Sequence, residues 1–281
     1  MSREPGTGLS HSLSRLSRKL PGNRPIISGV ILLQIVFLML PTIIVFIVSF
    51  QPGDIVRFPP DGFSLSWYAE IPEQDQYISA LYRSVVAALF CTLFSIPIGI
   101  LTAIGLMRYD LRFSNLFQIY FLLPFTVPLV VSGVILMIIF GELGYIGQLW
   151  TVGLALTIIN IPFMIWSVTS RVNALDPNLE NAAKNLGSDE LQTFVNVTLP
   201  AIMPGVVTGS LIMFVLGLNE FLVSLIITTT NNVTLPVVIY TAIRSNISPL
   251  IAAVASIYVL VAFIAVLVSD RLVGLEELLS S

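Results

Sequence analysis

The residues of this sequence that could take part in chemistry are polar groups set within apolar segments. Glu220 interrupts an apolar stretch that continues to about Thr228, Asn219 precedes it, and Asn160 lies within another uncharged segment. A charge in such a segment costs roughly 2.5–3.5 kcal/mol on membrane-insertion scales, so it normally faces a cavity or a partner. These three polar side chains are therefore candidates to line a pathway for a polar solute.

Each of these candidates also has a structural explanation. Glu220 could instead contact a partner subunit, be buried as a protonated acid, or lie near the membrane interface. Asn160 could satisfy backbone groups freed near Pro162, since proline removes a backbone donor from its helix. The residues alone leave these alternatives open.

Catalytic and metal-binding chemistry is not expected of this chain. It has one cysteine, Cys91, inside an apolar run, and one histidine, His11, in a polar N-terminal tail. These residues provide neither a cluster of histidine and cysteine metal ligands nor a histidine-based catalytic pair. We therefore expect no enzyme activity, and no metal, cofactor or nucleic acid bound by the chain itself.

The elements that position the polar residues are expected to be membrane-spanning helices. The chain is 56% hydrophobic and 10% charged, with a mean hydropathy of +0.93, whereas a soluble domain carries about 25% charged residues. A helix crosses the hydrocarbon core with about 20 apolar residues. Segments of that size predict an all-α protein with six transmembrane helices, at roughly 27–50, 80–106, 115–140, 147–169, 203–228 and 248–270.

Lysine and arginine in the loops predict the orientation, because cytoplasmic loops carry an excess of these residues. One side of the expected bundle carries Arg3, Arg15, Arg18, Lys19, Arg24, Arg108, Arg112, Arg171, Lys184 and Arg271. The other side carries only Arg57, Arg83 and Arg244. Both termini are therefore expected in the cytoplasm. The predicted organisation is a tail, a membrane domain and a second tail, at 1–25, 26–272 and 273–281.

Residues 171–202 interrupt the hydropathy pattern on the predicted cytoplasmic side and read as two short helices. Asp176 is a suitable N-cap for the first helix, and Pro177 suits the first helical position. Gly187 can take the left-handed conformation that ends a helix. Ser188 is then expected to cap the second helix.

The first of these short helices carries a stripe of small and apolar residues, Leu179, Ala182, Ala183 and Leu186. Their spacing places them on one helical face, and the two alanines allow another backbone to approach closely. Such a helix suits a groove on a partner, but it could also lie on the membrane surface or on its own bundle. The residue pattern alone does not favour the partner groove over the membrane surface or the bundle.

The same segment resembles the EAA loop of the permease subunits of ABC importers. That motif consists of Glu-Ala-Ala, three residues, Gly, nine residues, Ile, one residue and Leu-Pro. The positions that match it in register are Ala182, Ala183, Gly187, Leu199 and Pro200. Val197 stands at the isoleucine position, and Asn181 stands at the glutamate position with Glu180 beside it.

This resemblance implies a type I ABC importer permease fold, in which a coupling loop docks into an ATP-binding subunit. The residues to which it assigns that role are Glu180, Asn181, Ala182, Ala183, Gly187, Leu199 and Pro200. The sequence has no Gly-x-x-x-x-Gly-Lys-Ser/Thr phosphate-binding loop, so ATP and Mg²⁺ are expected on a separate partner subunit.

Two further segments resemble the second permease subunit of spermidine/putrescine-type transporters. One runs from Phe58 to Tyr68, in the expected outer loop, and the other runs from Leu218 to Ser224. The resemblance implies a polyamine substrate. The alternative is an amino-acid derivative or an opine-like compound, because Arg83 near the expected outer mouth is less suited to a cation.

The expected function is import across the bacterial inner membrane by alternating access, as a multi-pass protein of the lipid bilayer. The resemblance implies a second permease subunit in a heterodimer, two ATP-binding subunits and an extracytoplasmic substrate-binding protein. An ion-coupled secondary transporter is a rival from another class. It would need intramembrane charges to carry the coupling ion, and Glu220 is the only candidate.

Overall fold

The computed structural model describes residues 24–108, 120 and 126–273, and every regular element within these ranges is a helix. The predicted all-α class is therefore confirmed for the described part of the chain. The elements are α2 (Arg24–Val48), α3 (Ser66–Glu70), η1 (Ile71–Glu73), α4 (Asp75–Arg108), α6 (Leu129–Glu142), α7 (Leu149–Ala174), α8 (Pro177–Asn185), α9 (Glu190–Thr193), the π-helix η2 (Phe194–Thr198), α10 (Leu199–Asn219), α11 (Leu222–Ile227), α12 (Leu235–Ser245) and α13 (Pro249–Val273).

Within the described ranges, five helical stretches are long and apolar enough to cross a membrane. They are Ser28–Val48, Asp75–Arg108, Leu149–Ala174, Glu190–Asn219 and Pro249–Leu267. Each corresponds to one of the predicted spans. The span predicted at 115–140 falls largely outside the described residues, and only its second half is seen, as the shorter apolar helix α6. The total of six spans stays a prediction, and most of both predicted tails, with His11, also lies outside the described residues.

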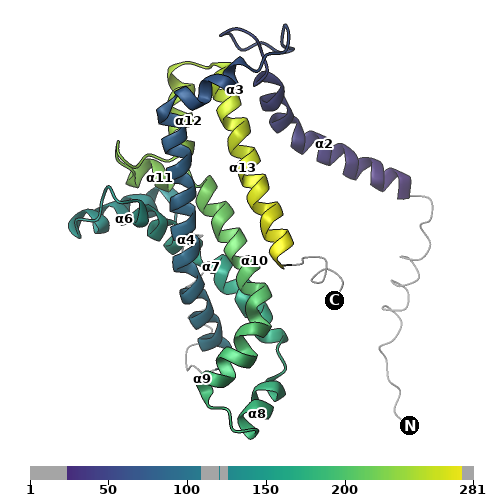
Figure 1. Cartoon of the computed structure of the whole chain (residues 1–281), viewed down its shortest axis with the longest axis vertical. Coiled ribbons are helices and arrows are strands. Elements are labelled where there is room, and N and C mark those ends of the chain that lie inside the picture. The colour runs from purple at the N-terminus through teal and green to yellow at the C-terminus, as the bar shows by residue number, and fades with distance from the viewer. Residues whose placement is uncertain (1–23, 109–119, 121–125, 274–281) are drawn as a thin grey trace, which may run out of the picture.

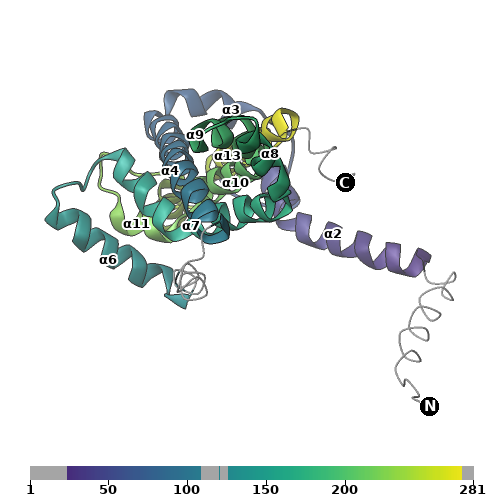
Figure 2. The ribbon, with the colours of Figure 1, turned by 90° about the horizontal axis from the view of Figure 1, so that it is seen from below.

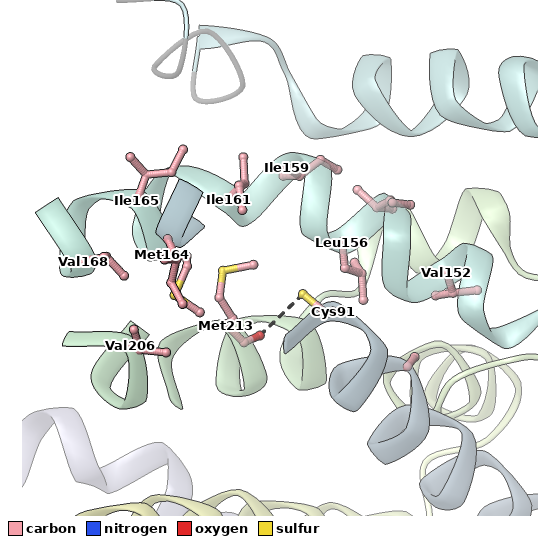
Figure 3. Packing of buried hydrophobic residues seen from close by; sticks show 14 of the residues in the cluster. Cys91, Val152, Leu156, Ile159, Ile161, Met164, Ile165, Val168, Val206 and Met213 are labelled. Atoms are coloured by element: carbon pink, nitrogen blue, oxygen red, sulfur yellow. Dashed lines mark hydrogen bonds between the residues drawn. The ribbon is translucent and has the colours of Figure 1, made fainter. Parts of the chain in front are cut away.

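The hydrophobic core lies where α4, α7 and α10 pack together (Figure 3). α7 is the central helix, and its residues Val152, Leu156 and Met164 are fully buried. Met213 of α10 and Cys91 of α4 lie next to each other beside this helix, and the Cys91 thiol donates to the Met213 carbonyl oxygen at 3.7 Å. A helix that is apolar on all faces belongs in the middle of a bundle, which explains the place of α7.

Small residues allow these three helices to approach closely. A Cβ on Gly205 of α10 would lie 2.8 Å from the Ser167 carbonyl oxygen of α7, and one on Gly217 would lie 3.3 Å from the Ala88 Cα of α4. The Ser167 hydroxyl also donates to the Gly205 carbonyl oxygen at 2.8 Å. Close packing and hydrogen bonds drive helix association in membranes, so α10 is held against both neighbours.

The bundle has two distinct ends (Figure 1). α8 and α9 form one end, where α4 finishes, and α3 and α12 lie at the opposite end, where α4 begins. We call these the α8 end and the α12 end. α2 leaves the α12 end and extends away from the bundle in both views (Figure 2). Its side chains are correspondingly exposed, as Leu33 at 69% and Phe37 at 73% illustrate.

Two elements differ from the sequence prediction. The fifth span, predicted as one helix at 203–228, is broken, because α10 ends at Asn219 and α11 begins only at Leu222. Glu220 lies between them with extended backbone angles (φ −71°, ψ 117°). α12 was not predicted at all, although its first residue, Leu235, is almost fully buried.

Candidate functional site

The start of α8 has the predicted structure. The Asp176 side chain accepts a hydrogen bond from the backbone N–H of Asn178 at 2.9 Å, and Pro177 is the first residue of the helix. An aspartate N-cap satisfies one of the backbone donors that the first turn leaves without a partner. The local sequence therefore specifies this boundary.

The end of α8 also follows the prediction. Gly187 has a φ of 95°, in the left-handed region that glycine adopts without strain. Its N–H donates to the Lys184 carbonyl oxygen at 3.0 Å, and the N–H of Ser188 donates to the Ala183 carbonyl oxygen at 3.1 Å. These are the two bonds of a Schellman helix end, so α8 is a short helix with a defined structure at each end.

The N-cap of α9 differs from the prediction by one residue. Asp189, not Ser188, accepts from the backbone N–H of Gln192 at 2.7 Å, and the Gln192 side chain accepts from the N–H of Asp189 at 3.3 Å. This reciprocal pair is a capping box. Ser188 cannot form one, because the residue three positions after it is Leu191.

The apolar stripe of α8 faces away from the bundle. Leu186 is 89% exposed and Leu179 is 53% exposed, while Ala182 is exposed and Ala183 is half-buried. The exposure of Leu186 and Leu179 argues against the alternative in which the stripe lies on its own bundle, for the residues that the structure describes. A capped helix with exposed leucines is therefore available to a partner or to a membrane surface.

Glu180 faces the bundle and joins α8 to two other elements. One of its carboxylate oxygens accepts from a terminal guanidinium nitrogen of Arg108 at 3.1 Å and from the Thr198 hydroxyl at 2.7 Å. Arg108 is the last residue of α4, and Thr198 is the last residue of η2. Sequence reasoning assigned no role to Arg108 beyond its charge and none to Thr198, because a pairing across this distance in the chain leaves no local pattern.

The other residues predicted to couple lie near this ion pair or at the start of α10. Asn181 is exposed and has no side-chain hydrogen bond within the described residues. Leu199 begins α10 and packs partly buried against the core, and Pro200 follows it directly after the π-helical turn η2, within the continuous helical stretch Glu190–Asn219. The structure thus brings the predicted coupling residues together at the α8 end.

Glu220 occupies the break between α10 and α11. Its carboxylate accepts a hydrogen bond from the backbone N–H of Val223 at 3.1 Å, in the first turn of α11. In the last turn of α10, just before the break, the Leu218 carbonyl oxygen accepts from the Tyr258 hydroxyl of α13. These side chains satisfy backbone groups that an unbroken helix would pair internally, which is the physical reason why the predicted single helix is two.

Aromatic rings lie directly beside this break. The rings of Phe221 and Tyr240 are 4.7 Å apart between centroids, and Tyr240 belongs to α12. The Tyr240 hydroxyl accepts from Arg244 at 2.8 Å, and the Arg244 guanidinium also lies 5.7 Å from the Tyr240 ring centroid. The break therefore carries the Glu220 carboxylate and the Phe221 ring, and α12 adds the Tyr240 ring and the Arg244 guanidinium beside them.

The two asparagines of the predicted pathway differ in their surroundings. Asn219 is exposed, and its amide donates to the Val215 carbonyl oxygen of its own helix at 2.9 Å. Asn160 is 7% exposed within α7 and donates to the Leu156 carbonyl oxygen at 3.0 Å. That acceptor is not the Ile158 carbonyl, which is the one left unpaired by the missing N–H of Pro162. Asn219 and Glu220 thus lie together, whereas Asn160 is enclosed in the core.

A separate open hollow of about 380 Å³ lies at the α12 end, between the start of α4, α12 and the start of α13. Its polar lining includes Gln76, Thr241, Ser245 and Asn246. None of the three pathway candidates contributes to it, and no pattern in the sequence singled out its residues.

Comparisons with known proteins agree with this architecture. Residues 95–275 match the family described as binding-protein-dependent transport system inner membrane component. The chain is similar to the spermidine/putrescine transport system permease protein PotC of Escherichia coli K12, with 29% identity over 83% of this chain and 88% of PotC. It is also similar to the putrescine transport system permease protein PotI of the same strain, with 30% identity over 81% of this chain and 83% of PotI.

A solved structure with the same fold is that of a bacterial alginate ABC transporter in complex with an alginate pentasaccharide-bound periplasmic protein. The TM-score is 0.67 at 16% sequence identity, and the match covers 89% of this chain and 94% of the other. The match extends beyond residues 171–202 to most of the described helices. This chain therefore belongs to the family of binding-protein-dependent inner membrane transport components, the multi-pass permease subunits of ABC importers, which are transport components rather than enzymes.

Proposed function

We propose that this chain is the permease subunit of an ATP-driven importer for a small organic amine, with a polyamine such as spermidine or putrescine as the favoured substrate. The observation that carries the proposal is α8, a helix capped at both ends, joined to the bundle by Glu180 and exposing Leu179 and Leu186 at one extremity of the molecule. The similarity to permeases of spermidine and putrescine transport systems supports the choice of substrate.

The proposed orientation places the α8 end and both termini in the cytoplasm. The basic residues support it, because Arg108, Arg171 and Lys184 belong to the α8 end, whereas Arg57 and Arg244 belong to the other. Cytoplasmic loops carry such an excess of lysine and arginine. The first half of the span at 115–140 completes six transmembrane helices in this proposal.

The proposed complex contains a second, non-identical permease subunit, two ATP-binding subunits and an extracytoplasmic binding protein. ATP and Mg²⁺ bind to the ATP-binding subunits, and α8 docks on one of them. The exposed apolar surface of α2 supports a neighbour from the bilayer or from the second permease, because a helix that is apolar all round is covered by lipid or protein.

The proposed pathway passes the break between α10 and α11. Asn219 and Glu220 lie there with side chains that are exposed or half-buried, and the Phe221 and Tyr240 rings beside them suit an organic ammonium group, which is attracted to aromatic faces. Asn160 is the innermost candidate and requires α7 to move away from α4 or α10 before solute can reach it.

An amino-acid derivative or opine-like compound is the second candidate substrate. Arg83 and Arg244 favour it, because neither forms an ion pair with a carboxylate within the described part of the chain. A guanidinium without an acidic partner can bind a substrate carboxylate. In that case Glu220 would bind the amino group of the same molecule.

Uptake into proteoliposomes that contain the whole complex tests the function. We expect accumulation of labelled putrescine or spermidine to require the binding protein outside the vesicle and ATP in its lumen, which corresponds to the cytoplasm. Accumulation should continue after the proton gradient is collapsed. Accumulation of a labelled zwitterionic amino-acid derivative, without accumulation of labelled polyamine and without competition by an excess of polyamine, would establish the second candidate. Uptake that follows the proton gradient without ATP would contradict the proposal and support an ion-coupled transporter.

A further inference from the structure

One carboxylate joins three segments of the chain at the α8 end. Glu180 lies in the first turn of α8, Arg108 ends α4, and Thr198 ends η2 where α10 begins. The same Glu180 oxygen accepts from Arg108 at 3.1 Å and from Thr198 at 2.7 Å. We call these three residues the Glu180 junction.

The Glu180 junction is largely shielded from water, unlike the other ion pair of the described residues. The side chains of Arg108 and Glu180 are 20% and 18% exposed, and Thr198 is 5% exposed. By contrast, the Arg57–Asp61 pair at the other end has side chains that are 60% and 65% exposed. Exposed pairs contribute little, whereas loss of one partner from a shielded pair leaves an uncompensated charge.

The connections of α8 along the chain are short and lead only to its neighbours in the sequence. Two residues, Leu175 and Asp176, connect α8 to α7, and the segment after it turns at Gly187. Through the chain itself α8 is joined only to α7 and, by way of α9 and η2, to α10. α4 and α8 are not neighbours in the sequence, and the Arg108 side chain joins them by a non-covalent ion pair with Glu180.

α4 extends from the junction to the opposite end of the molecule (Figure 1). Near that end the Ser84 hydroxyl accepts from the backbone N–H of Leu235, the first residue of α12, at 2.7 Å. α4 is one helix, with Pro97 within it, and so connects the Glu180 junction with α12, whose Tyr240 ring contacts Phe221 beside the α10 break. The π-helical turn η2 lies between α9 and α10, and such turns are frequent at functional sites. We expect the helix that contains α10 to adjust its geometry at this turn.

We propose that the Glu180 junction carries the movement of α8 to α4, so that ATP-driven displacement of α8 reaches the α12 end through Arg108 as well as through α7 and α10. This inference rests on the proposed function, because it requires α8 to be moved by an ATP-binding subunit. Glu180 and Arg108 are positioning residues, and neither needs to touch the solute.

The test uses the complete complex in proteoliposomes and measures solute transported per ATP hydrolysed. Arg108→Gln and Glu180→Gln should each assemble and hydrolyse ATP, but lower this ratio about ten-fold, which corresponds to a coupling of about 1.4 kcal/mol. The double variant should lose no more than either single variant. The reversed pair, Arg108→Glu with Glu180→Arg, and the conservative Arg108→Lys should each recover part of the ratio.

Arg57→Gln is the matched control, because it removes an exposed ion pair with an N–O distance of 3.0 Å and should leave the ratio unchanged. Thr198→Val retains the ion pair and should give an intermediate loss, which keeps the inference testable if Arg108→Gln does not assemble. Unchanged ratios in all junction variants, or losses that add in the double variant, would overturn the inference. If instead the unaltered complex shows no ATP-driven uptake, the proposed function itself fails.

Discussion

Glu220 accepts a hydrogen bond from the backbone N–H of Val223 at 3.1 Å, so one carboxylate both marks the end of α10 and satisfies the first turn of α11. The acid that the sequence nominated for a solute pathway therefore has a structural role as well. The two roles can be separated by experiment, since the capping bond needs an oxygen acceptor and the solute interaction needs the charge.

Glu220→Gln should retain the cap and lose the charge, because the glutamine side chain keeps a carbonyl oxygen. If Glu220 binds a cationic solute, uptake per assembled complex should fall roughly ten- to a hundred-fold, since a charge-assisted hydrogen bond is worth about 1.5–3 kcal/mol. Glu220→Ala, which removes both functions, should in addition destabilise the α10–α11 region. Normal uptake by the glutamine variant would show that the charge lies off the pathway, and dissociation of the permease pair would assign it to the subunit interface.

Gly187→Ala should disturb the docking of α8 on the ATP-binding subunit without preventing membrane insertion. Its φ of 95° would strain any residue with a Cβ, at a cost of about 1–2 kcal/mol, although no atom lies within 4 Å of the added carbon. The expected result is loss of solute-stimulated ATP hydrolysis by the complex. Gly144→Ala is the matched control, because Gly144 also has a positive φ (71°) and open space around it but belongs to the turn after α6. Equal behaviour of the two variants would remove the special role of α8.

Single cysteines at Asp61 and Lys184 should react with an impermeant thiol reagent from opposite sides of the membrane. Both positions are exposed, and the native Cys91 is buried and would be replaced by serine to leave one reactive thiol in each variant. Labelling of residue 184 only after the cytoplasmic side is opened, and of residue 61 in intact cells, is expected. Reaction of both from the same side would refute the proposed orientation.

Gly205→Ala should weaken the contact between α10 and α7. The added Cβ would lie 2.8 Å from the backbone carbonyl oxygen of Ser167, which cannot rotate away as a side chain could. Overpacking of this kind costs about 1–3 kcal/mol, so thermal unfolding in detergent should occur at a lower temperature. Gly105→Ala in α4 serves as the comparison, since nothing lies within 4 Å of its Cβ and alanine favours a helix by up to about 1 kcal/mol. A lower unfolding temperature for Gly105→Ala than for Gly205→Ala would contradict the packing argument.

The ends of α8 and the start of α9 were predicted from the sequence with different accuracy. Asp176, Pro177 and Gly187 were predicted from the sequence with the roles that they have, because helix caps depend on backbone groups within a few residues. The second cap was predicted one residue too early. The pair formed by Asp189 and Gln192 was visible in the sequence, and its spacing is the signal that would have selected aspartate over serine.

Contacts between distant parts of the chain explain what was missed. At the break after Asn219, the Tyr258 hydroxyl of α13 donates to the Leu218 carbonyl oxygen. At the other end, Arg108 of α4 holds α8 against the bundle through Glu180. α12 had a local signal, with Pro236 in its first turn, but it is too short to cross a membrane and was not separated from the surrounding loop.

An all-helical membrane protein, the positions of most of its long helices and a capped helix after α7 could all be predicted from the amino-acid sequence. Apolar length and capping chemistry are encoded within single segments, so they can be read without neighbours. The pairing of Glu180 with Arg108, the outward exposure of Leu186 and the break of the fifth span at Glu220 became visible only in the folded chain. Those outcomes depend on which side chains from other helices are close enough to satisfy a charge or a backbone group.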